Sequence, residues 1–253
     1  MLEAVADQLG LDCFDLLGIS MGAPTSIAFA TRHPDRVGRL VVYGGFANGQ
    51  ELGPGEARTA MMDLIWAHWG LGSNVLADIF IPDADAERRA RFTRLQRASG
   101  SAEVVCQLLA QGYLLRIEDL LDQVATPSLV IHWREDRAVP YRLGRDLAAR
   151  IPGARLVSLD GQAHFPYDGD AESIIRATLE FLGAPPPRRQ PGELTARQLE
   201  VAGLVADGCS NRQIAERLGI EERSAEGHVE RIRQRLGFTS RTQIAAWWAH
   251  TTT

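Results

Sequence analysis

The sequence predicts an α/β domain with a helical cap, followed by a small all-α domain of four helices that includes a helix-turn-helix. In residues 1–182, short apolar runs alternate with amphipathic helical patterns, as in a parallel sheet covered by helices. A proline cluster then interrupts the chain, and beyond it helix-capping signals recur at short intervals. These three observations indicate two domains, which is also the first guess for a chain of 253 residues.

The alternating part contains four apolar runs that predict strands. They lie at residues 14–18, 39–43, 128–132 and 155–159. Amphipathic patterns predict helices at 23–33 and 145–151. A long insertion at about 50–121 separates the second strand from the third and carries aromatic residues at mostly helical spacing, which predicts a helical cap over the sheet.

The proline cluster predicts a linker. Prolines at 185, 186, 187 and 191 cannot continue a helix and favour an extended, semi-rigid spacer. We therefore divide the chain into a domain at 1–182, a linker at 183–192 and a second domain at 193–253.

Two capping boxes mark helix starts in the second domain. Thr195 with Gln198 begins the first helix, and Ser210 with Gln213 begins the second. Asp207 and Gly219 follow the ends of these two helices.

A third helix is predicted at 222–236, and Ser240 would cap the fourth. The apolar positions of the four helices are expected to meet in one small core. They are Leu199, Val205, Ile214, Leu218, Val229, Ile232, Leu236, Ile244 and Trp248.

Composition limits the classes of protein that the chain can be. An apolar content of 45% with 23% charged residues excludes a wholly disordered or collagen-like chain. No apolar run approaches the roughly 18 residues of a membrane helix, and the opening residues lack a basic signal-peptide region, so we expect a cytoplasmic protein without membrane contact. No residue cluster suggests a metal or an organic cofactor. The net charge is −7 over residues 1–187 and +2 over 188–253.

The pentapeptide Gly18-Ile-Ser-Met-Gly22 follows a predicted strand and opens a predicted helix. In that context Gly-x-Ser-x-Gly predicts a nucleophile elbow, a strained turn whose flanking residues must be glycine because larger ones would collide. The turn would project the Ser20 hydroxyl from the strand end. The backbone amide of Met21, at the start of the helix, could then donate to a developing oxyanion.

A serine hydroxyl needs a histidine to take its proton and a carboxylate to orient that histidine. Asp136 lies in the loop after the third strand and His164 in the loop after the fourth. Glu135 is a competing acid, although the loop pattern favours Asp136. His68 and His132 are interpreted as core or surface histidines.

On these motifs, residues 1–182 resemble the C-terminal two-thirds of an α/β-hydrolase domain. The order serine, aspartate, histidine and the segment His33-Pro-Asp-Arg-Val37 add to the resemblance. It implies a partial α/β-hydrolase sheet and a catalytic triad of Ser20, Asp136 and His164 that acts on esters or related acyl compounds. The cap would select the substrate.

The family's first four strands, and the loop with its other oxyanion amide, would precede residue 1 and occupy about 60 to 90 residues. We therefore expect either that the sequence begins late or that the domain is a remnant. Loss of one oxyanion donor costs about 10²- to 10³-fold in rate, so hydrolysis by this chain would be weak.

Residues 193–250 resemble the LuxR/NarL-type DNA-binding domain almost throughout. The resemblance rests on segments such as Gly208-Cys-Ser-Asn-Arg-Gln-Ile-Ala-Glu-Arg-Leu-Gly-Ile220 and Leu236-Gly-Phe-Thr-Ser-Arg-Thr-Gln243. It implies a helix-turn-helix whose second helix enters the major groove of double-stranded DNA, and a homodimer.

The apolar residues of the third helix face the core, so its opposite face is expected to meet DNA. In the family, the positions that match Glu226, Gly227 and Glu230 commonly touch bases or phosphates and are commonly basic or polar, whereas two are acids here. Affinity would then come from arginines and helix N-terminal amides. The expected DNA contacts are Asn211, Arg223, Ser224, Glu226, Gly227, Glu230, Arg231, Arg235 and Arg241.

The two resemblances together imply a DNA-binding transcriptional regulator of LuxR type with a hydrolase-like domain that senses or converts a small acyl or ester ligand. The alternative is a serine esterase whose C-terminal helical domain only recruits or dimerises it. The sequence leaves open the ligand, the operator and whether the protein activates or represses.

Overall fold

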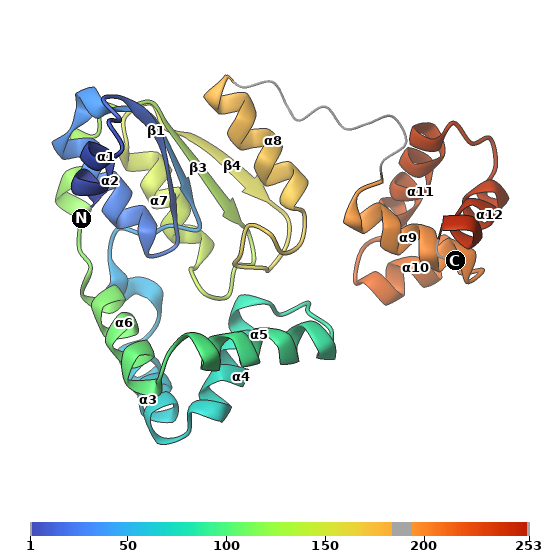
Figure 1. Cartoon of the computed structure of the whole chain (residues 1–253), viewed down its shortest axis with the longest axis horizontal. Helices are drawn as coiled ribbons and strands as arrows, with labels where there is room; N and C mark the ends of the chain where they lie inside the picture. The colour runs from blue at the N-terminus through green and yellow to red at the C-terminus, as the bar shows by residue number, and fades with distance from the viewer. Residues whose placement is uncertain (1, 184–193, 252–253) are drawn as a thin grey trace. The chain divides into compact units, whose positions relative to one another are not determined.

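The structure is a computed structural model that describes residues 2–183 and 194–251. It divides into two compact units, Met1–Pro186 and Pro187–Thr253 (Figure 1). Of the linker expected at 183–192, only Gly183 lies within the described residues.

A four-stranded parallel sheet forms the centre of the first unit. Its strands lie side by side in chain order and match the predicted strands to within two residues. They are β1 (Phe14–Ile19), β2 (Val37–Tyr43), β3 (Ser128–Trp133) and β4 (Arg155–Leu159). Because the strands are parallel, their carboxyl ends meet at one edge of the sheet, where open α/β sheets bind ligands.

Helices cover both faces of the sheet. Alternate residues of β2 point to opposite faces, which explains the near-continuous apolar run of this strand. One face packs against α2 (Gly22–Arg32) and α7 (Tyr141–Arg150), and the other packs against α8 (Ala171–Leu182). Two helices were not among the predicted elements: α8, and the short helix α1 (Leu2–Gln8) that precedes β1.

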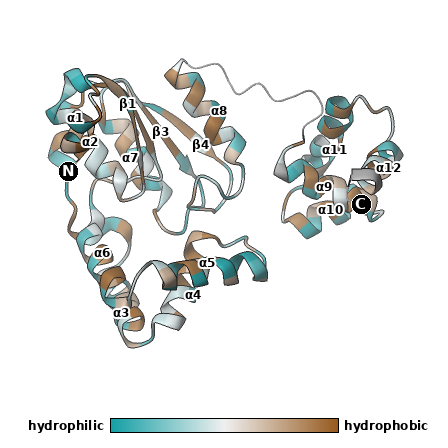
Figure 2. Ribbon diagram, viewed as in Figure 1, coloured by the Kyte–Doolittle hydropathy of each residue, from teal (hydrophilic) through white to brown (hydrophobic). Residues whose placement is uncertain are grey.

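The insertion between β2 and β3 forms a cap, as predicted. It contains four helices: α3 (Gly55–Ala67), α4 (Trp69–Phe80), α5 (Ala86–Ser99) and α6 (Ala102–Leu114). Short 3-10 turns precede and follow them, at Gly49–Leu52 and Glu118–Gln123, and another, Pro34–Arg36, precedes β2. Figure 2 shows that α5 is largely hydrophilic whereas the strands are hydrophobic.

The second unit consists of four helices around one small core. They are α9 (Ala196–Ala206), α10 (Asn211–Leu218), α11 (Glu222–Leu236) and α12 (Arg241–Thr251). Both predicted capping boxes are confirmed: the Thr195 hydroxyl accepts from the Gln198 amide at 2.9 Å, and the Ser210 hydroxyl accepts from the Gln213 amide at 3.2 Å.

One predicted core position is wrong. Leu199 is 37% exposed, while Gln198, Val201, Ala202 and Val205 form the buried stripe of α9. Since successive helical residues are rotated by about 100°, Leu199 lies one position away from that stripe and faces outward.

The turn between β1 and α2 is strained at Ser20, which has a φ of 52° without being glycine. A Cβ atom at Gly18 would lie 2.7 Å from Ser26 Oγ and 2.9 Å from Ala23 Cα, so only glycine fits there. A Cβ atom at Gly22 would have no neighbour within 4 Å, so the expectation that both flanking glycines avoid collisions is wrong for Gly22.

The two glycines therefore predict opposite effects of the same substitution. Gly18→Ala should lower the free energy of unfolding of the first unit by roughly 1 to 3 kcal/mol, because the added methyl group forces backbone shifts. Gly22→Ala should leave it unchanged or raise it by up to about 1 kcal/mol, because the unfolded chain loses freedom. Urea denaturation of both variants checks this, and equal destabilisation would contradict it.

Candidate active site and nucleic-acid interface

The three predicted catalytic residues lie at the carboxyl ends of three strands. Ser20 follows β1, Asp136 lies in the loop after β3, and His164 lies in the loop after β4. The Ser20 amide donates to the Tyr43 carbonyl at the end of β2 at 2.9 Å, and the Ser20 carbonyl accepts from the Ala23 amide at 2.9 Å. The strained turn is thus fastened on both sides, which directs the serine side chain outward from the strand end.

These residues form one continuous chain of hydrogen bonds. His164 Nε2 lies 2.8 Å from Ser20 Oγ, and His164 Nδ1 lies 2.9 Å from Asp136 Oδ2. His164 is 1% exposed and Asp136 is 7% exposed. The competing acid Glu135 is exposed instead, so Asp136 is the carboxylate that meets the histidine.

Backbone amides orient the Asp136 carboxylate. Its Oδ1 accepts from the amides of Ala138 at 2.8 Å and Val139 at 3.0 Å, which leaves Oδ2 to face the histidine. His132, which lies four residues before Asp136, is buried, and its Nε2 lies 3.7 Å from Asp136 Oδ2. Burial lowers the pKa of His132 below its ordinary value of 6.5.

The cap also contacts His164, which the sequence analysis did not predict. The His164 amide donates to the Phe80 carbonyl at the end of α4 at 3.0 Å, and the two rings stack with centroids 5.5 Å apart. Farther along the same loop, Arg88 of α5 donates to the buried carboxylate of Asp168 at 2.5 Å. The histidine loop is therefore held by two cap helices as well as by the sheet.

Gly44 is a second residue that sequence reasoning missed. It follows β2 with a φ of 54°, and a Cβ atom there would lie 3.3 Å from His164 Cε1. The pair Gly44-Gly45 directly after a predicted strand was the available signal, because glycine in that place allows a close approach.

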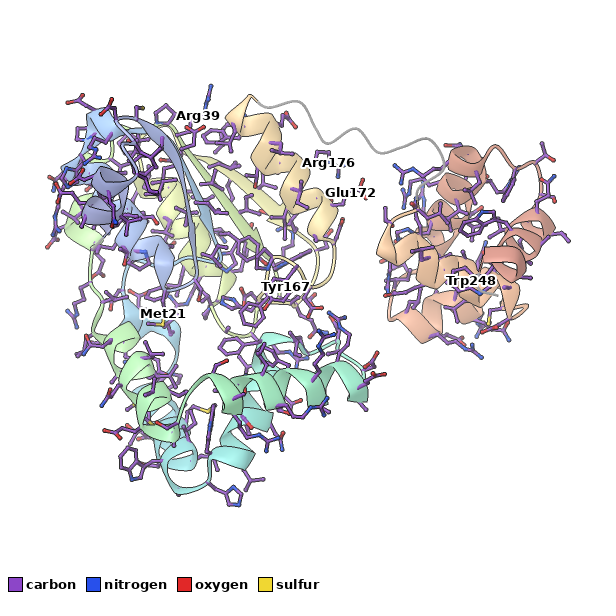
Figure 3. The ribbon with its side chains drawn as sticks, viewed as in Figure 1. Met21, Arg39, Tyr167, Glu172, Arg176 and Trp248 are labelled. Carbon is purple, nitrogen blue, oxygen red and sulfur yellow. The ribbon has the colours of Figure 1, made fainter. Side chains whose placement is uncertain are left out.

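Met21, the predicted oxyanion donor, lies at the start of α2. Its side chain reaches the cap between α2 and α6: a Cβ atom at Gly112 of α6 would lie 2.9 Å from Met21 Cε (Figure 3). Its amide follows Ser20 directly at the positive end of α2, where helix amides favour negative charge.

This geometry can support nucleophilic acyl chemistry. An imidazole within hydrogen-bonding distance of a hydroxyl can accept its proton, and a carboxylate on the other ring nitrogen stabilises the imidazolium that forms. Among the described residues, no group of three or more His, Cys, Asp or Glu side chains is placed to hold a metal ion. Within the same part of the chain, no helix combines the length and apolar character that spanning a membrane requires.

In the second unit, α10 and α11 form the predicted helix-turn-helix. Gly219 ends α10 in the left-handed conformation, with a φ of 62°, and the turn leads to Glu221 at the N-cap of α11. Glu221 makes no side-chain capping bond. Ala225, Val229 and Ile232 bury one face of α11 in the core, so the opposite face remains exposed.

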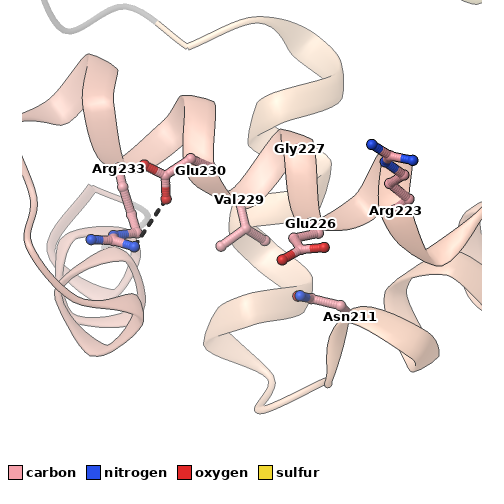
Figure 4. Close-up of a pocket in the computed structure, with 7 residues that line it drawn as sticks. All are labelled: Asn211, Arg223, Glu226, Gly227, Val229, Glu230 and Arg233. Carbon is pink, nitrogen blue, oxygen red and sulfur yellow. Dashed lines mark hydrogen bonds and ion pairs between the residues drawn. The ribbon is translucent and has the colours of Figure 1, made fainter.

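Five of the predicted DNA contacts line one groove formed by residues of α10 and α11 (Figure 4). They are Asn211, Arg223, Glu226, Gly227 and Glu230, and Val229 and Arg233 complete the lining. Arg231 lies alongside Gly227, since a Cβ atom at Gly227 would be 3.6 Å from its guanidinium. Ser224 is exposed in the first turn of α11.

Two predicted contacts instead bond within the unit. Arg235 donates to the side chain of Gln198 at 2.8 Å. Arg241 donates to the side chain of Asn211 at 2.7 Å and to the Cys209 carbonyl at 2.5 Å. Burial lowers the pKa of Arg241, as expected for a cation that is removed from water.

Glu230 is also partnered, by Arg233 at 2.9 Å and Gln234 at 3.1 Å. Its charge is thus offset within α11, while Arg223 and Arg231 are exposed.

Comparison with known families assigns both units. Residues 2–167 match the family described as serine aminopeptidase, S33, and residues 192–248 match the bacterial regulatory proteins of the luxR family. A 2-hydroxy-6-oxononadienedioate/2-hydroxy-6-oxononatrienedioate hydrolase from Cupriavidus pinatubonensis is 29% identical over 192 residues, and one from Burkholderia vietnamiensis is 31% identical over 193. Each alignment spans 72% of this chain but 66% of the relative, slightly less than two thirds of its length.

Solved structures show the same fold in the first unit. A hydrolase from Pseudomonas aeruginosa PA01 superposes with a TM-score of 0.64 at 25% identity and covers 72% of this chain and 69% of its own. The enol-lactonase from Burkholderia xenovorans LB400 has a TM-score of 0.61 at 24% identity, and the match covers 72% of this chain and 70% of the lactonase chain. The chain therefore belongs to the serine aminopeptidase S33 family, with an α/β-hydrolase fold, and carries a luxR-family domain at its C-terminal end.

Proposed function

We propose that the protein is a transcriptional regulator whose second unit binds double-stranded DNA and whose first unit takes a small acyl or ester compound as its ligand or substrate. The observation that carries the proposal is the presence, in one chain, of a luxR-family helix-turn-helix and an assembled serine–histidine–aspartate arrangement. Helix-turn-helix proteins bind paired half-sites as dimers, so we expect a homodimer.

The exposed face of α11 is the proposed DNA contact. Arg223 and Arg231 are free to reach phosphates, and the amides at the start of α10, beginning at Asn211, can donate to phosphate oxygens. Glu226 can accept from the amino group of a cytosine in the major groove. Because Arg235 and Arg241 already hold partners within the unit, phosphate binding depends mainly on Arg223 and Arg231.

In the first unit, the proposed chemistry begins when His164 Nε2 removes the proton of Ser20 as Oγ attacks the ligand's carbonyl carbon. Asp136 would hold the imidazolium, and the Met21 amide would donate to the oxyanion. The leaving group would then take the proton from His164, and water would release the acyl group from Ser20. The names of the relatives supply a first compound to test, 2-hydroxy-6-oxononadienedioate.

A second candidate function is a serine esterase whose helical unit only recruits or dimerises it. The observation that favours it is the pair of acids on the exposed face of α11, Glu226 and Glu230, since carboxylates repel phosphates.

Removing one exposed arginine should weaken DNA binding. Arg223→Ala and Arg231→Ala should each raise the Kd for a random-sequence 30-base-pair duplex and reduce the slope of log K against log salt by about 1, because one phosphate contact is lost. Fluorescence anisotropy of the whole chain at several salt concentrations measures both. Arg145→Ala removes the same charge from an exposed site on α7 and should leave both values unchanged. Equal effects at all three sites would contradict the assignment.

Ser20→Ala separates the two candidate functions. It should abolish labelling by a fluorophosphonate probe and lower the hydrolysis of p-nitrophenyl acetate by at least about 10³-fold, because the nucleophile is gone. Duplex binding at low salt should survive. Strong labelling of the parent chain together with undetectable duplex binding would favour the esterase. Duplex binding without labelling or turnover would exclude it.

A further inference from the structure

His132 is a buried histidine beside the proposed catalytic residues that the chemistry above does not use. It lies near the end of β3 and is fully buried. Its Nε2 is 2.8 Å from the Val139 carbonyl oxygen. The ring therefore joins the strand to the loop that follows Asp136.

The partners of the ring determine its tautomer. A carbonyl oxygen can only accept, so Nε2 carries the hydrogen and donates to Val139. Nδ1 has no hydrogen-bond partner among the described residues, and a Cβ atom at Gly144 of α7 would lie only 2.2 Å from it. A proton on Nδ1 would be buried without an acceptor, and burial lowers the pKa of His132 accordingly. His132 is thus a neutral donor.

Val139, which accepts from His132, also contacts the carboxylate of Asp136. The amide of the same residue, Val139, donates to Asp136 Oδ1, together with the Ala138 amide. Both donors keep Oδ1 turned toward the loop and leave Oδ2 for His164. His132 therefore holds the carbonyl of the same residue, Val139, whose amide helps to orient the carboxylate.

We propose that His132 is a positioning residue for Asp136: by donating to the Val139 carbonyl, it fixes the loop that presents the carboxylate to His164. The proposal rests on the proposed acyl chemistry at Ser20. An apolar side chain of similar size would fill the space but leave the buried carbonyl without its donor. The titratable groups that face His132 are Asp136, His164 and Tyr141. Tyr141 approaches from α7, and its ring lies edge-on to the imidazole with the two centroids 5.9 Å apart.

Two substitutions separate positioning from packing. His132→Leu fills the site without a donor, whereas His132→Gln retains an N–H group that can reach the Val139 carbonyl. For p-nitrophenyl acetate, we expect His132→Leu to lower kcat by up to about 10²-fold with KM nearly unchanged, because the carboxylate is misplaced. The pH profile of kcat should change as well, because the carboxylate orients the histidine that accepts the Ser20 proton. His132→Gln should restore much of both.

A readout that needs no turnover keeps this test independent of the proposed function. We expect the proton between His164 Nδ1 and Asp136 to give its own ¹H NMR resonance at low field, which His132→Leu should broaden or shift and His132→Gln should retain. A parent chain with this resonance but without hydrolysis or fluorophosphonate labelling would contradict the acyl chemistry, and the resonance would still decide the role of His132.

Should His132→Leu fail to fold, Gly144→Ala pushes on the ring while keeping the donor, and it should shift the same resonance. The proposal is overturned if His132→Leu folds with the parent resonance and pH profile. It is also overturned if His132→Gln lowers kcat and alters the resonance as much as His132→Leu does.

Discussion

The candidate active site of the first unit depends on one buried imidazole, that of His164. His164 bonds to Ser20 through one ring nitrogen and to Asp136 through the other, while its backbone amide and its ring both contact Phe80 of the cap. Segments that are far apart in the chain therefore meet at this ring; Ser20 and His164 alone are 144 positions apart. The cap contributes part of the histidine's environment. On our proposal, a compound that binds beneath the cap therefore also affects the histidine loop.

In the second unit, two arginines that were predicted to contact DNA form hydrogen bonds within the unit instead. Arg235 and Arg241 hold helices together by bonding to Gln198, Asn211 and the Cys209 carbonyl, so much of the positive charge serves the fold. The exposed face of α11 is left with few cations and with acids beside them. On our proposal, such a face gains little from general attraction to phosphate and must rely more on contacts with particular bases.

Local signals in the sequence predicted much of this structure, because they report short-range physics. The capping boxes at Thr195 and Ser210, the strand boundaries and the loop positions of Asp136 and His164 all follow from neighbours in the chain. The features that were not predicted are mainly contacts between distant segments of the chain. The stacking of Phe80 on His164 has no signature in either local sequence. Nothing near Arg235 or Arg241 indicated that both turn inward, and a periodicity error of one residue placed Leu199 in the core.

The histidine loop also connects the candidate active site to α8. Asp168, which is bonded to Arg88 of the cap, lies just before Asp170, whose side chain caps α8, and α8 ends at Leu182. A regulator of the proposed kind requires that a group bound at Ser20 changes DNA binding, and coupled sites typically change affinity by about 5- to 150-fold. The direct measurement is the Kd of the whole chain for a duplex selected from genomic fragments, before and after complete phosphonylation of Ser20. We predict a change of at least about 5-fold in either direction; identical values would contradict the coupling.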